Sequence, residues 1–373
     1  MEPLRIGVNA LYLIPGGVGG TEIYLRGLLR SLAEIDGRNH YFVFTNRETC
    51  RDLTPAAPNF TEVRQPLRAA SRPWRILWEQ TGLPLWAARL RLDVMLNPGF
   101  TAPLLAGCPQ VTVFHDLQHL RHPEYFRWFD LPFWRFFLYW SAVVSRVVVA
   151  NSQATAADLV KFYRLPADKI RIAPLGVDPV FFELAARRQP RPFLLAVSTL
   201  HPHKNLDGLL RAFAEFRKER PEFRLVVCGL HGFFTGPLHT LRDSLGLRDA
   251  VDFPGWIPRE DLHQLFAQAW AFIYPSLFEG FGIPVVEALA AGVPSACSNI
   301  EPMRSIAGEA AWQFDPRDPA AMLEALRRIT TDHPLRARLA RLGPHQAAGF
   351  SWQKTAAETL EAIQIASLHS TLG

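Results

Sequence analysis

The first half of the chain alternates short apolar runs with segments whose apolar residues recur at helical spacing. Strands are expected at Leu4–Ala10, Tyr41–Thr45, Val94–Asn97, Val111–His115 and Val147–Asn151. The run Val147-Val148-Val149-Ala150 has no polar residue, which is typical of a strand buried on both faces. Helical spacing is clearest at Leu25, Leu28, Leu29 and Leu32. This alternation predicts a parallel sheet joined by crossover helices.

The second half of the chain starts the same pattern again. Strands are expected at Phe193–Ser198, Leu225–Gly229, Val251–Phe253, Ala271–Tyr274 and Val293–Ala296. Helices are expected at Leu206–Arg220, Arg259–Gln268 and Pro284–Ala291, with a last amphipathic helix from about Trp352 to Ile365.

These patterns predict an α/β protein with two doubly wound parallel-sheet, Rossmann-like domains that face a cleft. The chain has 373 residues, about twice the size of one domain. We expect domains at residues 1–182 and 193–351, because the segment 183–192 is polar, contains two prolines and reads as a linker. Residues 352–373 are expected to pack back on the first domain. Ligands of such sheets bind beyond the carboxyl ends of the strands.

One of these carboxyl ends is followed by a loop rich in glycine and flanked by acids. After the strand Ala271–Tyr274 come Glu279, Gly280, Phe281, Gly282 and Ile283, and then Pro284, which suits the first turn of a helix. Such a helix start favours a bound phosphate. Glu287 is expected on the first turn, so both carboxylates would face one ligand. The alternative interpretation is that Glu279 caps the helix and Glu287 is a solvated surface acid.

A second glycine-rich turn joins the first strand to the first helix and contains Gly17, Gly19 and Gly20. It differs from the dinucleotide-binding fingerprint, because the third glycine of that motif would fall at Glu22. It also lacks the Gly-Lys-Ser/Thr of a phosphate-binding Walker loop. The turn suits donor phosphates or an acceptor, and the alternative is a flexible loop without a ligand.

Further candidates follow two other strands. His115 ends the fourth predicted strand, and His203 with Lys204 follows the strand Phe193–Ser198. His119 and His122 lie close to His115, but that spacing suits metal ligands only on a helix. No Asp-x-Asp motif occurs, so we expect no metal site.

The positive charge of the chain is concentrated in its first half. Residues 1–175 carry 20 Lys and Arg against 14 Asp and Glu, whereas residues 176–373 carry 20 against 21. The same half holds a dense aromatic segment, residues 125–140, with interspersed arginines. This segment is either a core helix or an interfacial patch that makes peripheral contact with an anionic membrane. No compact basic run or known motif indicates nucleic acid.

The cysteines and the apolar runs indicate the compartment. Four scattered cysteines, Cys50, Cys108, Cys228 and Cys297, form no zinc spacing and fit a reducing environment. No apolar run reaches about 18 residues without a charge, and the first residues do not form a signal peptide. We therefore expect a cytoplasmic protein, on the inner face of a membrane if the aromatic patch is interfacial.

Taken together, several short motifs of this sequence resemble those of the family 4 retaining glycosyltransferases, and they span nearly the whole chain. The shared motifs are Gly16-Gly17-Val18-Gly19-Gly20, Phe114-His115-Asp116-Leu117, Asn151-Ser152-Gln153, Pro174-Leu175-Gly176-Val177-Asp178, His203-Lys204-Asn205-Leu206, the pair Glu279 and Glu287, and Glu301-Pro302 before Ala307-Gly308. The family carries two glutamates eight residues apart, with Gly-Phe-Gly after the first. The His-Asp-Leu motif looks most like that of the mannosyltransferase branch, whose members build bacterial surface polysaccharides.

The resemblance implies a GT-B fold and a role for each matched residue. Glu287 would hold the ribose of a nucleotide sugar, Glu279 and His115 would lie by the transferred sugar, and Lys204 would face the diphosphate. The backbone from Gly280 to Ile283 would contact sugar and phosphate. Family members usually place an arginine just before this lysine or six residues before it, whereas this chain has His203 and Ser198 there.

The expected reaction is transfer of a hexose, with retention, from a nucleotide diphosphate sugar to a saccharide or lipid-linked saccharide. GDP-mannose is the favoured donor, and no cofactor is expected beyond this co-substrate. Two alternatives stay open: a sugar-nucleotide epimerase of similar fold, and a non-catalytic subunit that binds a sugar nucleotide.

Overall fold

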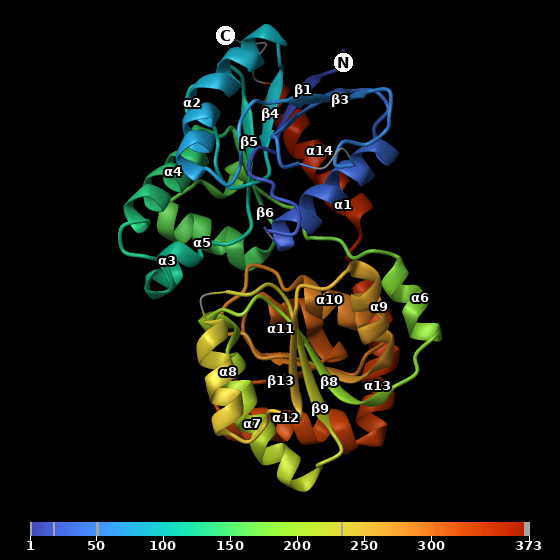
Figure 1. Cartoon of the computed structure of the whole chain (residues 1–373). Helices are drawn as coiled ribbons and strands as arrows, with labels where there is room; N and C mark the ends of the chain where they lie inside the picture. The colour runs from blue at the N-terminus through green and yellow to red at the C-terminus, as the bar shows by residue number, and fades with distance from the viewer. Residues whose placement is uncertain (1, 18, 50–51, 233, 369–373) are drawn as a thin grey trace. The chain divides into compact units, whose positions relative to one another are not determined.

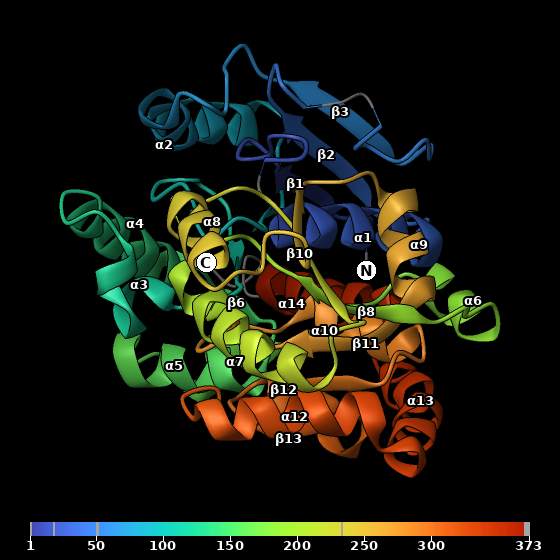
Figure 2. The ribbon, with the colours of Figure 1, turned by 60° about the horizontal axis from the view of Figure 1, so that its bottom comes forward.

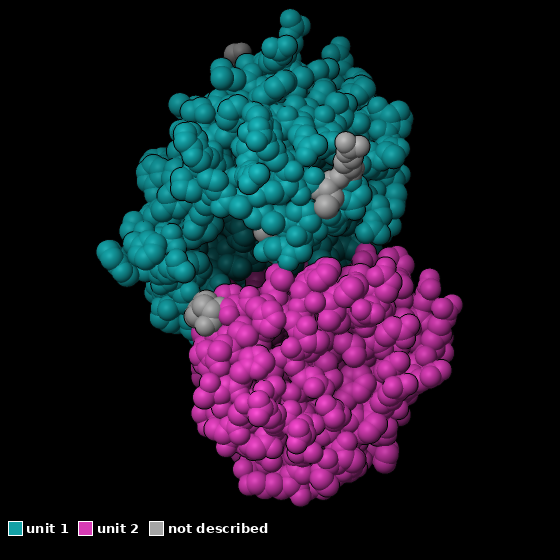
Figure 3. Space-filling model, in the orientation of Figure 1, with its two compact units in different colours: residues 1–176, 351–373 teal, residues 177–350 magenta. Residues whose placement is uncertain are grey.

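The structure is a computed structural model that describes residues 2–17, 19–49, 52–232 and 234–368. The chain divides into two compact units, coloured in Figure 3. Unit 1 consists of Met1–Gly176 and Ser351–Gly373, and unit 2 of Val177–Phe350. Each unit is built around its own parallel sheet (Figure 1).

The sheet of unit 1 has seven parallel strands in the order β3-β2-β1-β4-β5-β6-β7. Its strands are β1 (Arg5–Asn9), β2 (His40–Thr45), β3 (Phe60–Arg64), β4 (Val94–Asn97), β5 (Gln110–Phe114), β6 (Val147–Ala150) and β7 (Ile170–Ile172). All five predicted strands are present. The two strands missing from the prediction, β3 and β7, lie at the edges, where the residues are few or largely polar.

The helices of unit 1 cover its sheet. They are α1 (Gly20–Ile35), α2 (Arg72–Arg89), α3 (Gln118–Arg121), α4 (Leu131–Val144), α5 (Gln153–Tyr163) and α14 (Trp352–Leu368). Helix α14 packs against α1, although more than 300 residues separate them in the chain (Figure 1). Gly27 of α1 makes this contact close, because a Cβ there would lie 2.4 Å from the Trp352 ring.

The sheet of unit 2 has six parallel strands in the order β10-β9-β8-β11-β12-β13. Its strands are β8 (Arg191–Val197), β9 (Arg224–Cys228), β10 (Val251–Gly255), β11 (Ala269–Tyr274), β12 (Ser295–Ser298) and β13 (Trp312–Phe314). All five predicted strands are present, and the unpredicted β13 has only three residues. The helices are α6 (Val180–Ala186), α7 (Leu206–Glu219), α8 (Thr235–Ser244), α9 (Arg259–Gln268), α10 (Ile283–Ala290), α11 (Met303–Ala307), α12 (Pro319–Thr331) and α13 (His333–Ala347).

The segment predicted as a linker, residues 183–192, is not the boundary between the units. It contains the end of α6 and the start of β8, and the division falls at Gly176/Val177 and at Phe350/Ser351. One of its polar residues forms hydrogen bonds within unit 2: the Arg188 guanidinium donates to the backbone carbonyls of Phe266 (3.4 Å) and Ala269 (2.7 Å). Pro192 is tolerated because the pairing of β8 with β11 shifts register there.

Each sheet reverses its winding direction at one point. In unit 1 this switch point lies between β1 and β4, and in unit 2 between β8 and β11 (Figures 1 and 2). The loops that follow these strands lie at the carboxyl edge of the sheet, where doubly wound proteins bind ligands.

Candidate active site

Two loops meet at the switch point of unit 2. The loop after β8 ends in a short 3₁₀ turn, Pro202–Lys204, and the loop after β11 carries Glu279. The backbone N–H of Leu277 donates to the carbonyl of His203 at 2.7 Å. This bond ties the loops together, so residues 75 positions apart in the chain face one another.

Lys204 and Glu279 form an ion pair between these loops. The Lys204 Nζ lies 2.5 Å from the Glu279 Oε1 and 3.3 Å from the hydroxyl of Tyr274. Both charged side chains are almost buried, at 13% and 10% exposure. Burial, followed by the charge of Glu279, holds the pKa of Tyr274 well above its usual value, so this hydroxyl stays neutral. Glu279 is therefore held by a cation and is not a helix cap.

Helix α10 begins on a glycine without a side-chain cap. Its N-cap, Gly282, has φ 103° and ψ 50°, and Pro284 occupies the first turn. Glycine adopts this left-handed backbone without the steric strain that a Cβ would bring. The first turn contains no acid, so the prediction that Glu287 lies there is wrong: Glu287 lies further along the helix. The positive end of α10 is left free of a capping side chain.

Glu287 is buried and belongs to a second charged group. Its Oε1 accepts from Arg259 Nη2 at 2.9 Å, and the same nitrogen lies 3.0 Å from Asp178 Oδ2. The Arg259 guanidinium also lies over the Phe181 ring, 5.2 Å from its centroid. Burial raises the pKa of Glu287, Arg259 opposes this, and Asp178 adds to it. The alternative that Glu287 is a solvated surface acid is therefore wrong.

Arg259 is the functional candidate that the sequence did not reveal. It follows Pro258 at the start of α9 and reads as an ordinary first-turn residue. Its partner Asp178 is the last residue of a motif that resembles the glycosyltransferase family. That motif was the only sequence signal for this part of the site. The partnership depends on the packing of unit 2, in which α6 contacts both α9 and α10.

His203 lies in the same turn as Lys204. Its ring stacks on that of His201 with centroids 5.8 Å apart and an interplanar angle of 24°. Burial and the charge of Lys204 lower the pKa of His201. Lys204 pairs with Glu279, and His203 occupies one of the two positions where family members carry an additional arginine.

In unit 1, His115 follows β5 directly and is buried. Its Nε2 donates to the carbonyl of Pro98 at 2.9 Å, and the rings of Tyr24 and Phe100 meet it edge-on, with centroids 4.7 and 5.1 Å away. Burial lowers the pKa of His115 to about 4. The imidazole is therefore neutral around pH 7.

The glycine-rich turn of unit 1 folds onto the first turn of α1. The N–H of Gly16 donates to Glu22 Oε2 at 2.7 Å, and the N–H of Gly17 to the carbonyl of Ile14 at 2.8 Å. Gly19 is the N-cap of α1, with φ 59°, and Gly20 is its first residue. Val18 and Cys50 lie outside the described residues. The three candidate glycines are thus gathered at one helix N-terminus.

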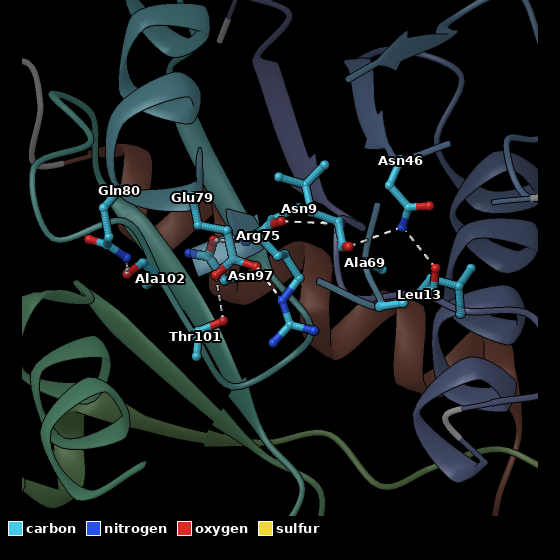
Figure 4. A network of polar contacts seen from close by, with 12 residues as sticks. Asn9, Leu13, Asn46, Ala69, Arg75, Glu79, Gln80, Asn97, Thr101 and Ala102 are labelled. Carbon is cyan, nitrogen blue, oxygen red and sulfur yellow. Dashed lines mark hydrogen bonds and ion pairs between the residues drawn. The ribbon is translucent and has the colours of Figure 1, made fainter. Parts of the chain in front are cut away.

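A buried polar network supports the loops of this edge (Figure 4). Glu79 of α2 is fully buried; it accepts from Thr101 Oγ1 at 2.8 Å, and its Oε1 lies 3.5 Å from Arg75 Nε. Asn46 donates to the carbonyls of Leu11 (3.0 Å) and Leu13 (2.8 Å). These contacts fix the loops after β1 and β4, and no motif in the sequence marks the residues that make them.

The histidines considered as metal ligands have other partners. His119 Nε2 lies 2.9 Å from the Tyr163 hydroxyl, and His122 Nδ1 lies 2.9 Å from Glu124 Oε1. Across the described ranges, no group of three or more His, Cys, Asp or Glu is arranged to hold a metal ion. Within the same ranges, no helix combines the length and apolar character needed to cross a membrane.

Family profiles and related sequences match this architecture. Residues 18–181 match "Glycosyltransferase Family 4", and residues 181–346 match "Glycosyl transferases group 1". The O-antigen chain mannosyltransferase B of Escherichia coli is 29% identical over 293 residues, or 75% of this chain and 76% of that protein. A D-inositol 3-phosphate glycosyltransferase of Acidothermus cellulolyticus is 30% identical, over 95% of this chain and 88% of that protein.

Solved structures share the fold over nearly the full chain. Sucrose-phosphate synthase from Thermosynechococcus elongatus superposes with a TM-score of 0.76 at 19% identity, over 100% of this chain and 99% of that one. HepE from Anabaena, in complex with UDP and glucose, superposes with a TM-score of 0.74 at 19% identity, over 97% and 99%. The predicted fold class is confirmed, and this chain belongs to the GT-B glycosyltransferases, with a family 4 first half and a group 1 second half.

Proposed function

We propose that this chain transfers a hexose, with retention, from a nucleoside diphosphate sugar to a saccharide or lipid-linked saccharide in surface polysaccharide synthesis. The observation that carries the proposal is the Lys204–Glu279 ion pair at the carboxyl edge of unit 2, where Glu279 lies three residues before Gly282, the uncapped start of α10. A fixed cation and a helix N-terminus beside a carboxylate suit a phosphorylated sugar donor.

The chemistry follows from the charges that develop as the glycosidic bond breaks. The leaving diphosphate gains negative charge, which Lys204 and the first N–H groups of α10 would stabilise more in the transition state than in the ground state. The sugar becomes oxocarbenium-like, and Glu279 with the backbone at Gly280 and Phe281 would lie against it. Glu287, oriented by Arg259, would accept hydrogen bonds from the ribose hydroxyls.

Unit 1 would supply the remaining contacts. His115, neutral and already donating through Nε2, would present its other ring edge to the transferred sugar. The backbone at Gly17, Gly19 and Gly20 would contact the donor phosphates or the acceptor. We assign no metal or further cofactor to the reaction, and we expect EDTA to leave the transfer rate unchanged.

The donor and compartment are proposed from the relatives and the cysteines. Mannosyltransferases are prominent among the relatives, which favours GDP-mannose, whereas HepE has been solved with UDP and UDP-glucose. Cys108, Cys228 and Cys297 are free thiols, which favours a reducing cytoplasm.

The deciding experiment is a thermal-shift screen with GDP, UDP, ADP and TDP and their sugars, followed by a transfer assay with the stabilising donor. A ligand that binds only the folded state stabilises it by RT ln(1 + [L]/Kd), so at equal concentrations the tightest-binding nucleotide and nucleotide sugar raise the melting temperature most. NMR of the product should show the anomeric configuration of the donor retained. Inversion would contradict the proposed mechanism, and donor epimerisation without an acceptor would favour the epimerase alternative.

A further inference from the structure

Helix α2 has large apolar side chains on its outer face as well as on its buried face, which includes Ile76, Leu83 and Ala87. Trp74, Leu77 and Leu85 are 67%, 51% and 73% exposed, and they recur at the spacing of one helical face. Glu79 on the opposite face is fully buried and lies beside Arg75. A surface helix of a globular protein normally has polar residues on its outer face, so the exposed Trp74, Leu77 and Leu85 suit an apolar contact.

Helix α4 and the residues before it add exposed aromatic rings. Trp128 is 82% exposed, and Phe136, Tyr139 and Trp140 of α4 are also exposed. Leu138 and Ala142 bury the other face of the same helix. The core-helix interpretation of this segment therefore holds for one face only. The other face leaves rings in contact with one another, with Tyr139 and Trp140 centroids 5.4 Å apart.

The two helices lie along the same side of unit 1 (Figures 1 and 2). Arg72, at the start of α2, pairs with Asp130 at 3.4 Å and stacks over the Trp134 ring of α4 at 4.0 Å. Nine of the thirteen exposed large apolar side chains among the described residues fall between positions 74 and 140. Eight of these nine lie on α2, on α4 or at positions 128 and 129 just before α4, so the exposed apolar surface is concentrated on these two helices.

The charges on this side are positive. Arg89, Arg127, Arg135 and Arg146 are exposed around the apolar residues. Of the acids in α2 and in residues 124–144, Glu79 is buried, Asp130 pairs with Arg72, and Glu124 pairs with His122. Arginine and tryptophan side by side are typical of surfaces that lie in the interface of an anionic bilayer.

We propose that the outward faces of α2 and α4 bind the surface of an anionic lipid bilayer. The inference rests on the proposed function and deepens it, because an acceptor with a lipid anchor would be met at that surface. Contact between two copies of this chain is disfavoured, because a symmetric interface would bring the same arginines against one another. The aromatic and leucine side chains supply apolar burial, and the arginines supply attraction to anionic headgroups.

The test is co-sedimentation of the full-length protein with vesicles of phosphatidylcholine alone or of phosphatidylcholine with phosphatidylglycerol. Wild-type protein should bind the anionic vesicles, and high salt should weaken binding. Trp74→Ser with Leu77→Ser and Leu85→Ser should reduce binding at least tenfold, as should Trp128→Ser with Phe136→Ser and Trp140→Ser. Arg127→Gln and Arg135→Gln should each reduce it about fivefold.

Trp256→Ser is the matched control for binding, because Trp256 is 60% exposed but lies in unit 2; its vesicle binding should equal that of wild type. No binding to anionic vesicles at low salt would overturn the inference. An equal loss of vesicle binding in Trp256→Ser would also overturn it. So would a dimer, detected by sedimentation, that the α2 and α4 substitutions dissociate while the wild-type protein does not bind vesicles. A chain that shows no transfer activity but still binds anionic vesicles through these helices would refute the proposed function and support the membrane-binding surface.

Discussion

The switch points of the two units share a design and differ in charge. In each, a helix starts on a glycine with positive φ and no side-chain cap: Gly19 before α1 and Gly282 before α10. The first turn of α1 contains Glu22, whose carboxylate already accepts from the N–H of Gly16. The first turn of α10 contains no acid. An anionic ligand is therefore better served at α10 than at α1.

The ionisable groups near the strand ends show the same contrast. Unit 2 places Lys204 with Glu279, and Arg259 with Glu287, in nearly buried pairs. The candidate of unit 1, His115, is neutral and donates to a backbone carbonyl. The comparison teaches that two parallel sheet edges with similar backbone geometry can differ in charge: that of unit 2 suits an anionic ligand, whereas His115 gives unit 1 a neutral hydrogen-bonding group.

The largest expected effect follows from removing the ion pair of unit 2. Lys204→Ala and Glu279→Ala should each lower the rates of transfer and donor hydrolysis by about a hundredfold to a thousandfold, because each removes fixed charge from the reacting centre. Steady-state assays with the donor from the thermal-shift screen measure this. Lys218→Ala is the control, since Lys218 pairs with Glu215 on the surface. Near-wild-type rates in both site variants would refute the site assignment.

The next effect concerns Arg259, whose positive charge compensates the negative charge of the buried Glu287. Arg259→Gln should destabilise the fold by about 3 kcal/mol near neutral pH, because it leaves a buried carboxylate without its cation. The loss of Arg259 raises the pKa of Glu287 further, so the folded state binds this proton more tightly than the unfolded state does. Stability of the variant is then highest below the unfolded value of 4.5 and falls as the pH rises through the folded pKa.

Urea unfolding of Arg259→Gln and wild type at about pH 5 and about pH 8 measures this difference. The double variant Arg259→Gln, Glu287→Gln should recover most of the stability at the higher pH, because the uncompensated charge is gone. If the double variant is as unstable as the single one, the effect of Arg259 is packing against Phe181 and not charge.

A smaller effect is expected at His115 in unit 1. His115→Gln should slow transfer about tenfold, the value of one neutral hydrogen bond, without changing nucleotide affinity. Because the pKa of His115 is about 4, the pH–rate profile of the wild type should show no ionisation of this residue above about pH 5. An inflection near pH 6.5 that disappears in the variant would show that the histidine titrates during the reaction.

The smallest effect tests the glycine at the start of α10. Gly282→Ala should lower stability by about 1 kcal/mol, because its φ of 103° strains any residue with a Cβ. The added Cβ would also lie 3.2 Å from Met303 Cγ. Gly236→Ala in α8 is the control, since its Cβ would meet nothing within 4 Å, and chemical denaturation compares the two. Equal stability of both variants would contradict the backbone argument.

The sequence predicted ten of the thirteen strands found among the described residues, because their apolar runs are long enough to stand out. It did not predict β3, β7 and β13, whose residues are polar or few. The boundary between units was misplaced for a related reason. Polar residues and prolines signal a linker, but Arg188 is used to bind backbone carbonyls within unit 2.

For the candidate site, the sequence identified which loops follow strands, and the resemblance indicated which residues to examine. It could not show that Glu287 is buried and paired with Arg259, because α9 and α10 come together only through the packing of unit 2. It could not show either that α2 leaves Trp74, Leu77 and Leu85 exposed. A helical pattern defines two faces, and only the neighbours of the helix decide which face is inside.

The sequence by itself therefore determined the alternation of strands and helices, and with it two parallel sheets whose loops gather at their carboxyl edges. This information is local, since periodicity and turn residues act over a few positions. The tertiary structure alone decided the pairing of Lys204 with Glu279, the neutral state of His115 and the outward face of α2. Each depends on distances and burial between segments far apart in the chain, which strand order and helix packing set.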